Sequence, residues 1–117
     1  MNYVHLIGHL GADPEMRYTP EGSAVATFRL AVNDGFGDKK TVSFFPIVAW
    51  NKQAESCNQY LRKGMKVAVT GKLRERSWDG DDGKKHYKTE VVARDIEFLT
   101  PKEKGTGADD DFDFDFE

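Results

Sequence analysis

Apolar and polar residues alternate with a period of two along most of the chain, the pattern of β-strands that bury one face. The clearest run is 24–32, where every even position is apolar. Similar or strongly β-forming runs predict further strands over residues 3–10, 41–50, 66–78 and 86–99. The sequence therefore predicts an all-β domain of five strands.

Clusters of turn-forming residues separate these strands. Gly, Pro, Asn, Asp or Ser gather in residues 11–14, 19–23, 33–40 and 79–85, and these residue types favour tight turns. We predict that residues 79–85 form the tip of a β-hairpin joining the last two strands.

One segment, between the third and fourth strands, has helical spacing instead. Its apolar residues recur at intervals that one helix face requires: Ala54, Cys57, Tyr60 and Leu61. Asn51 is a predicted N-cap, and Gly64 is predicted to stop the helix in a left-handed conformation. Five strands with a helix between the third and fourth is the order of the OB-fold, a five-stranded Greek-key barrel. The alternative is a three-stranded sheet with a loosely attached hairpin.

The charges of the chain are segregated into a basic body and an acidic end. The 117 residues carry a formal charge of −3, but residues 109–117 hold six acids and no base. Removing these six from the 20 acids leaves 14 against 17 Lys and Arg, a net charge of +3. We predict an OB-fold domain over 1–100, a polar linker over 101–108 and a disordered acidic tail over 109–117. A basic body favours a polyanionic partner, although such a tail is often only solubilising.

The sequence also argues against several protein classes. Its apolar runs are too short to cross a bilayer, and its first residues lack the pattern of a secretory signal. Cys57 is the only cysteine, which excludes an internal disulfide and a multi-cysteine metal site. We therefore expect a cytoplasmic protein.

No combination of residues indicates an enzyme, a metal or a cofactor. His5 and His9 lie in a strand pattern, and His86 has no metal-ligand companion in the sequence. Cys57 falls on the apolar helix face, where a buried, inert thiol is the usual outcome. The aspartates in 79–82 lack the spacing and closing Glu of a calcium loop, so a turn explains them better.

The strand over 66–78 combines cations with an aromatic ring. Its even positions carry Lys72, Arg74, Arg76 and Trp78. Alternation places these on the face opposite the predicted core residues Val67, Val69 and Leu73. Cations for phosphates and flat rings for unstacked bases are what a nucleic acid single strand requires. The alternative is a solvated face with Trp78 tucked under the next hairpin.

The third strand is apolar on both faces. Phe44, Val48 and Trp50 share one parity, and the opposite parity is also apolar. A small barrel has only one interior, so the outer face is either a binding platform or a subunit interface. Phe36 lies in a Gly-rich loop, where a core position is harder to justify.

Several stretches resemble the bacterial single-stranded DNA-binding protein family. They are LIGHLGADPEMRY at 6–18, GSAVA at 22–26, YLRKG at 60–64, VTGKLR at 69–74 and YKTEVV at 87–92. The resemblance extends from Asn2 to Leu99. It implies a non-enzymatic OB-fold protein, usually a homotetramer, that binds single-stranded DNA without sequence preference in DNA replication, recombination and repair.

The resemblance also implies the site residues. The stacking positions correspond to Phe36, Phe44, Trp50 and Trp78. The DNA-backbone contacts correspond to Lys52, Lys63, Arg74 and Arg76, with Arg62 and Lys72 as neighbours. Pro46 stands where the family often has a base, and because it cannot donate to a ladder it predicts a bulge or an edge. Phe45 lies where the family builds subunit contacts.

The tail resembles the segment with which the family docks replication and repair proteins. The implied contact residues are Asp109, Asp110, Asp111, Phe112, Asp113, Phe114, Asp115 and Phe116. Phe rings suit an apolar pocket and carboxylates suit surrounding bases, although the family's terminal Pro-Phe is replaced. Alternatively, the tail only competes with DNA for the basic groove. Two further functions stay open: an OB-fold adaptor for proteins, and a single-stranded RNA binder.

Overall fold

The computed structural model describes residues 1–100, and the predicted linker and acidic tail lie outside this range. The strands are β1 (Val4–Leu10), β2 (Glu15–Tyr18), β3 (Ala24–Asp34), β4 (Thr41–Trp50), β5 (Lys66–Asp79) and β6 (Lys85–Phe98). A 3-10 turn η1 (Gly37–Lys39) precedes β4, and the helix α1 (Asn51–Tyr60) follows it. All five predicted strands and the helix are confirmed. The short strand β2, which pairs with β3, was not predicted.

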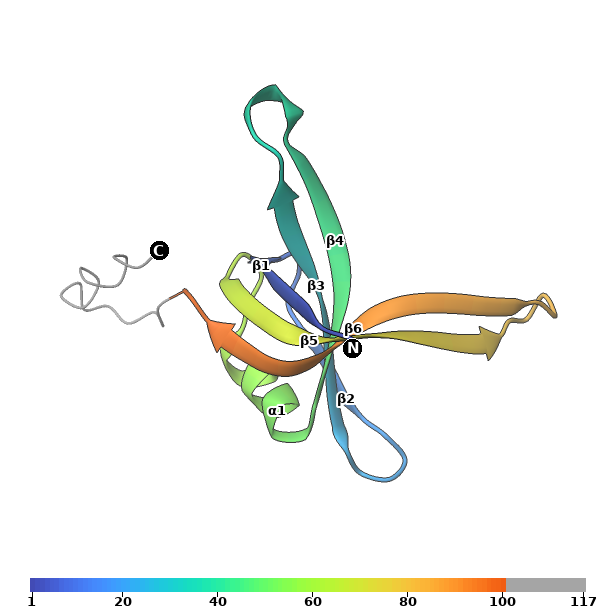
Figure 1. Cartoon of the computed structure of the whole chain (residues 1–117). Coiled ribbons are helices and arrows are strands. Elements are labelled where there is room, and N and C mark those ends of the chain that lie inside the picture. Colours follow the sequence, from blue (N-terminus) through green and yellow to red (C-terminus); the bar gives the residue numbers. More distant parts are fainter. Residues whose placement is uncertain (101–117) are drawn as a thin grey trace.

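The strands close into a barrel in the order β1-β5-β6-β4-β3, with β2 added beside β3 (Figure 1). Closure comes from two pairs between β1 and β3, His9 with Ala31 and Leu10 with Leu30. β4 and β6 run parallel, whereas the other neighbours are antiparallel. This is the Greek-key arrangement of the OB-fold. The alternative of a loose hairpin is wrong, because β5 pairs with β1 from Val4 to His9.

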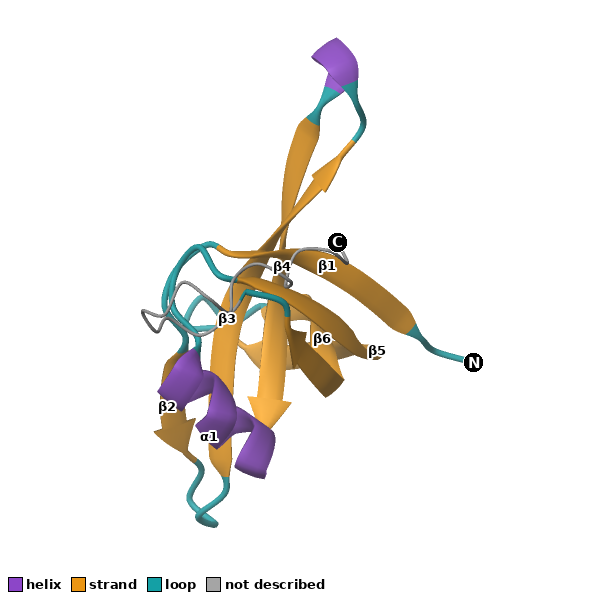
Figure 2. Ribbon diagram, turned by 90° about the vertical axis from the view of Figure 1, so that its left-hand side faces the viewer, coloured by secondary structure: helices purple, strands orange, loops and turns teal. Residues whose placement is uncertain are grey.

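The barrel interior confirms the period-two prediction. The even positions of β3 from Ala24 to Leu30 are buried, as are Ile47 and Ala49 of β4. The helix α1 lies against β3 and β4 at one end of the barrel (Figure 2) and contributes Ala54 and Cys57 to the same core. Fully burying a Leu or Ile side chain stabilises the fold by about 1.5–3 kcal/mol.

The ends of α1 differ from prediction. Asn51 is the first helical residue, with a positive φ of 58°, and Trp50 occupies the N-cap without a side-chain hydrogen bond. Gly64 is left-handed at φ 89°, but the helix has already ended at Tyr60. Instead, Arg62 Nη1 donates to the carbonyl oxygens of Asn58 and Leu61, at 3.1 and 2.6 Å. A side-chain cation therefore satisfies one carbonyl of the last helical turn and the carbonyl of the C-cap residue, where a glycine cap was expected.

Two hairpins project from the barrel as arms (Figure 1). One joins β3 to β4 and carries η1 at its tip, and the other, residues 74–90, joins β5 to β6. The pairing of β5 with β6 shifts its register at Thr70/Gly71 and is continuous along the rest of both strands. We call residues 74–90 the β5–β6 arm.

Leu73 corrects one prediction, because it is not in the core and is 46% exposed. Its neighbour strand β1 begins at Val4, which pairs with Gly71, so β1 does not extend alongside Leu73. Beyond that point β5 is a sheet edge, and the Asn2 side chain exchanges two hydrogen bonds with the Leu73 backbone, at 2.8 and 2.9 Å. The alternation is intact, but among residues 1–100 no layer covers Leu73.

Pro46 confirms the edge rather than the bulge. The register between β3 and β4 is unbroken, with Pro46 opposite Arg29. On its other side β4 pairs with β6 only at Ile47 and Val48. Pro46 thus lies at an open edge, where a missing N–H costs nothing.

Candidate nucleic-acid interface

A groove of about 610 Å³ crosses the outer face of the barrel, between β2, β3 and β4 and the base of the β5–β6 arm. Its apolar lining includes Val25, Val48 and Trp50. Its charged lining is Arg17, Arg74, Arg76, Lys88 and Glu90. Val25 and Val48 are buried but do not belong to the core cluster. The outer apolar face of β4 therefore forms the floor of a predominantly cationic groove.

The register of the β5–β6 arm brings charges from two strands together. Arg74 pairs with Glu90, and Arg76 pairs with Lys88. Arg74 Nη2 donates to Glu90 Oε2 at 2.5 Å, and Arg76 Nε lies 3.3 Å from Glu90 Oε1. Glu90 is only 4% exposed, whereas both arginines reach the surface. Four cations face one acid here, so the groove suits an anionic ligand.

Trp78 lies near the tip of the arm, one residue before the end of β5. It is 43% exposed, so it is not tucked under the hairpin. The ring of His86, its cross-strand partner, is stacked on it with centroids 5.7 Å apart. The Arg76 guanidinium carbon lies 5.4 Å from the Trp78 ring centroid. The arm thus carries an aromatic surface next to a cation, as predicted for this strand face.

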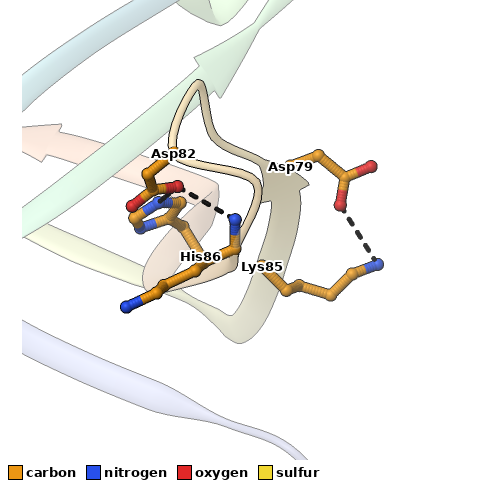
Figure 3. Close-up of polar contacts among 5 residues, drawn as sticks. Asp79, Asp82, Lys85 and His86 are labelled. Carbon is orange, nitrogen blue, oxygen red and sulfur yellow. Dashed lines mark hydrogen bonds and ion pairs between the residues drawn. The ribbon is translucent and has the colours of Figure 1, made fainter.

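The tip of the arm is held by polar contacts (Figure 3). Asp82 Oδ1 accepts a hydrogen bond from the Lys84 backbone N–H at 3.0 Å and lies 3.2 Å from His86 Nε2. The Lys84 hydrogen bond, followed by that of His86, lowers the pKa of Asp82. Lys85 and Asp79 form a further exposed pair at 3.8 Å. The aspartates therefore shape a turn, as predicted, and hold His86 against Trp78.

The other two predicted stacking residues lie on the projecting hairpin that joins β3 to β4. Phe36, at the start of η1, is 73% exposed. Phe44 is 48% exposed, and the Arg29 guanidinium carbon lies 5.1 Å from its ring centroid. Alternation puts Phe44 on the same face of β4 as Trp50, about 20 Å along the strand. Phe45, on the opposite face, packs against the core.

The remaining predicted cations lie outside the groove. Lys52 lines a separate hollow between α1 and the end of β6. Arg62 is engaged at the carboxyl end of α1, and Lys63 is exposed in the following turn. Lys72 lines a third hollow with Asn2 and Gly71 at the base of β5. Among the described residues of the predicted site, only Trp50, Arg74 and Arg76 therefore line the same groove.

Sequence reasoning missed four charged residues near these rings: Arg17, Arg29, Lys88 and Glu90. A signal for the last two was present, because the predicted hairpin tip is centred on Asp82. Counting outward equally from that residue pairs Lys88 with Arg76 and Glu90 with Arg74, as the structure does. Arg17 and Arg29 come from β2 and the outer face of β3 and gave no comparable signal.

Within residues 1–100, three or more potential metal ligands never gather at one point. Nor does this part of the chain contain a helix with the length and apolarity that crossing a membrane requires. Cys57 is fully buried, and burial raises the pKa of its thiol to about 11. The thiol is therefore protonated at neutral pH, as predicted for an inert core cysteine.

The chain is similar in sequence to known single-stranded DNA-binding proteins. The model of the single-strand binding protein family matches residues 1–99. A single-stranded DNA-binding protein of Bacillus cereus is 47% identical over 108 residues, which cover 90% of this chain and 64% of that protein. One from Caldanaerobacter subterraneus is 47% identical over 130 aligned positions, covering all of this chain and 86% of the relative. The chain thus spans under two thirds of the length of the Bacillus cereus relative.

A solved structure agrees with the sequence relatives. The single-strand binding protein of Plasmodium falciparum, in complex with single-stranded DNA, superimposes with a TM-score of 0.77 and 30% identity. The match covers 84% of this chain and 94% of the other. With the family model matching nearly all of the described residues, the chain belongs to the single-strand binding protein family.

Proposed function

We propose that this protein binds single-stranded DNA without sequence preference, as a non-enzymatic factor in DNA replication, recombination and repair. The observation that carries the proposal is the position of Trp50 on the floor of a groove bordered by Arg17, Arg74, Arg76 and Lys88. A flat ring among cations matches the two parts of an unpaired strand, its bases and its phosphates. The family membership and the DNA-bound relative support the same function.

Stacking supplies most of the affinity. A base on an aromatic side chain contributes about 1–3 kcal/mol, and every base has a π-face, so stacking tolerates any sequence. Arginine and lysine contacts to phosphates add a salt-dependent contribution. Both kinds of contact are independent of base identity, which accounts for binding without sequence preference.

The strand follows the aromatic residues beyond the groove. Trp78 lies on the β5–β6 arm, Phe44 lies on the hairpin that joins β3 to β4, and Phe36 lies at the tip of that hairpin. The cations outside the groove then contact the DNA backbone where the strand passes over the barrel: Lys52, Arg62, Lys63 and Lys72. Each is exposed to solvent, as such a contact requires.

A fluorescence titration tests the proposal. Adding an oligo-dT of about 30 nucleotides at low salt should quench Trp50 and Trp78, because bases stack on their rings. Binding should weaken as salt rises, since phosphate contacts release counterions. An oligo-dT that produced no quenching at low salt would overturn the function. Competition by RNA of matched sequence would separate a DNA binder from an RNA binder, because only RNA carries the 2′-hydroxyl.

Assembly, location and partners complete the proposal. The protein acts as a homotetramer in the cytoplasm, and its acidic tail recruits replication and repair proteins. Light scattering after size-exclusion chromatography, with and without oligo-dT, measures the assembly. A single-subunit mass in both conditions would contradict the tetramer.

A further inference from the structure

The candidate groove contains one buried acid that the proposed function leaves unexplained. Glu90 is 4% exposed and lines the groove beside Arg74 and Arg76. A carboxylate in a site for a polyanion should repel the ligand, and a buried charge is costly unless it is paired. The contacts of Glu90 therefore need a functional explanation.

The two carboxylate oxygens of Glu90 hold two different arginines. Oε2 accepts from Arg74 Nη2 at 2.5 Å, and Oε1 lies 3.3 Å from Arg76 Nε. Each guanidinium carries five N–H donors, so most donors stay available. The Nε of Arg74 is buried and has no partner within the described residues. Arg76 thus contacts the carboxylate through Nε and also lies over the ring of Trp78.

We propose that Glu90 is a positioning residue that holds Arg74 and Arg76 towards the groove, with Arg76 kept beside Trp78. The proposal rests on the proposed binding of single-stranded DNA. A free arginine loses rotamer freedom when it meets a phosphate, whereas an anchored one has already lost it. The repulsion from Glu90 is small by comparison, because two guanidinium groups within 3.3 Å leave the three residues with a net positive charge.

The opposite role would be an electrostatic brake, in which Glu90 only weakens DNA binding. The two roles predict changes of opposite sign for Glu90→Gln, which keeps the side-chain shape and removes the charge. Positioning predicts about a tenfold loss of oligo-dT affinity, in the range of strongly coupled neighbours. It also predicts that the slope of log K against log salt becomes shallower by about 0.7–1.4, the equivalent of one or two phosphate contacts. A brake predicts tighter binding.

Glu75→Gln is the matched control. Glu75 lies on the same arm, is exposed and has no ion pair among the described residues. Its substitution removes the same charge, so the affinity should stay unchanged or rise slightly. Circular dichroism and thermal unfolding of each variant show that the titrated protein is folded.

Two further variants separate positioning from a structural role. Glu90→Asp keeps the charge but shortens the side chain, so it should weaken binding, whereas a brake would leave the affinity unchanged. In a variant that already carries Arg74→Ala and Arg76→Ala, adding Glu90→Gln should weaken binding no further. A Glu90→Gln protein that binds oligo-dT as tightly as the original chain would overturn the positioning role. Failure of the unsubstituted protein to bind would instead overturn the proposed function.

Discussion

In the proposed DNA binding, flat rings and cations contribute in different ways. Trp50 lies in the groove, Trp78 lies on the β5–β6 arm, and Arg76 contacts the Trp78 ring. Rings contribute through stacking, which depends little on salt, and cations contribute through phosphates, which depends on it strongly. Substitutions of the two kinds should therefore have distinct signatures.

Replacing Trp50 or Trp78 with alanine should lower oligo-dT affinity by about 1–3 kcal/mol each, with little change in salt slope. Arg74→Ala is the comparison, and it should make the slope shallower. Titrations at several salt concentrations give both quantities. The reverse pattern, a salt effect for the rings and none for Arg74, would mean that the side chains assigned to the DNA-binding groove do not contact DNA.

The buried Cys57 thiol should make stability depend on alkaline pH. Its pKa is about 11 in the folded protein, against an ordinary value of 9.0. The unfolded chain therefore releases the proton at lower pH, and the contribution to folding stability present below pH 9 is lost as pH rises towards 11.

Thermal unfolding from neutral pH to pH 11 measures this contribution. The melting temperature should fall more steeply above pH 9 for the original protein than for Cys57→Ala, because the variant has no thiol to ionise. The variant keeps every other side chain, so it controls for all other effects of alkaline pH on stability. Parallel declines would contradict the raised pKa.

Among the elements, the contact between β1 and β3 closes the barrel and depends on a glycine. A Cβ at Gly8 would overlap the carbonyl oxygen of Ala31 and reach within 3.2 Å of the Leu30 side chain. Backbone at the closure point cannot move aside without separating the strands. The absence of a side chain at Gly8 is therefore a requirement of the fold.

Gly8→Ala should destabilise the protein by about 1–3 kcal/mol, the usual cost of overpacking. Gly11→Ala is the control, because its Cβ would meet the exposed Phe44 ring at 3.1 Å, and that ring has room to move. We expect its effect to stay within about 0.5 kcal/mol. Urea unfolding of the three proteins gives the comparison. Equal losses would show that the closure point tolerates a side chain.

At the scale of the whole molecule, charge separates a basic body from an acidic end. The six acids of residues 109–117 turn a body of net charge +3 into a chain of net charge −3. Any electrostatic influence of that end on DNA binding acts by reducing the attraction between the body and phosphates.

Deleting residues 109–117 should leave oligo-dT affinity equal or raise it, with the largest gain at low salt where screening is weakest. Parallel titrations of both proteins at low and high salt measure the change. The adaptor function predicts instead that deletion abolishes the main activity, which is then the binding of partner proteins through the tail. A fall in oligo-dT affinity on deletion would contradict the electrostatic role of the tail.

Local pattern alone determined most of the fold. Alternation located five strands and the even-numbered core of β3, because side-chain direction in a strand depends only on position along it. Helical spacing located α1, and the turn residues around Asp82 located the hairpin that carries Trp78. The cations and rings of β5 were assigned to one face for the same reason.

Tertiary structure decided which of these residues meet. Leu73 is exposed because β1 begins only at Val4. Lys52 lies apart from the groove because it belongs to α1 and faces the hollow between α1 and β6. Strand order places Trp50 near Arg17, and cross-strand register buries Glu90 between two arginines. The pairing of Arg74 with Glu90 alone could have been counted from the hairpin tip at Asp82. The other arrangements join residues distant in the chain, so the periodicity of one strand, which describes only that strand's two faces, contains no information about them.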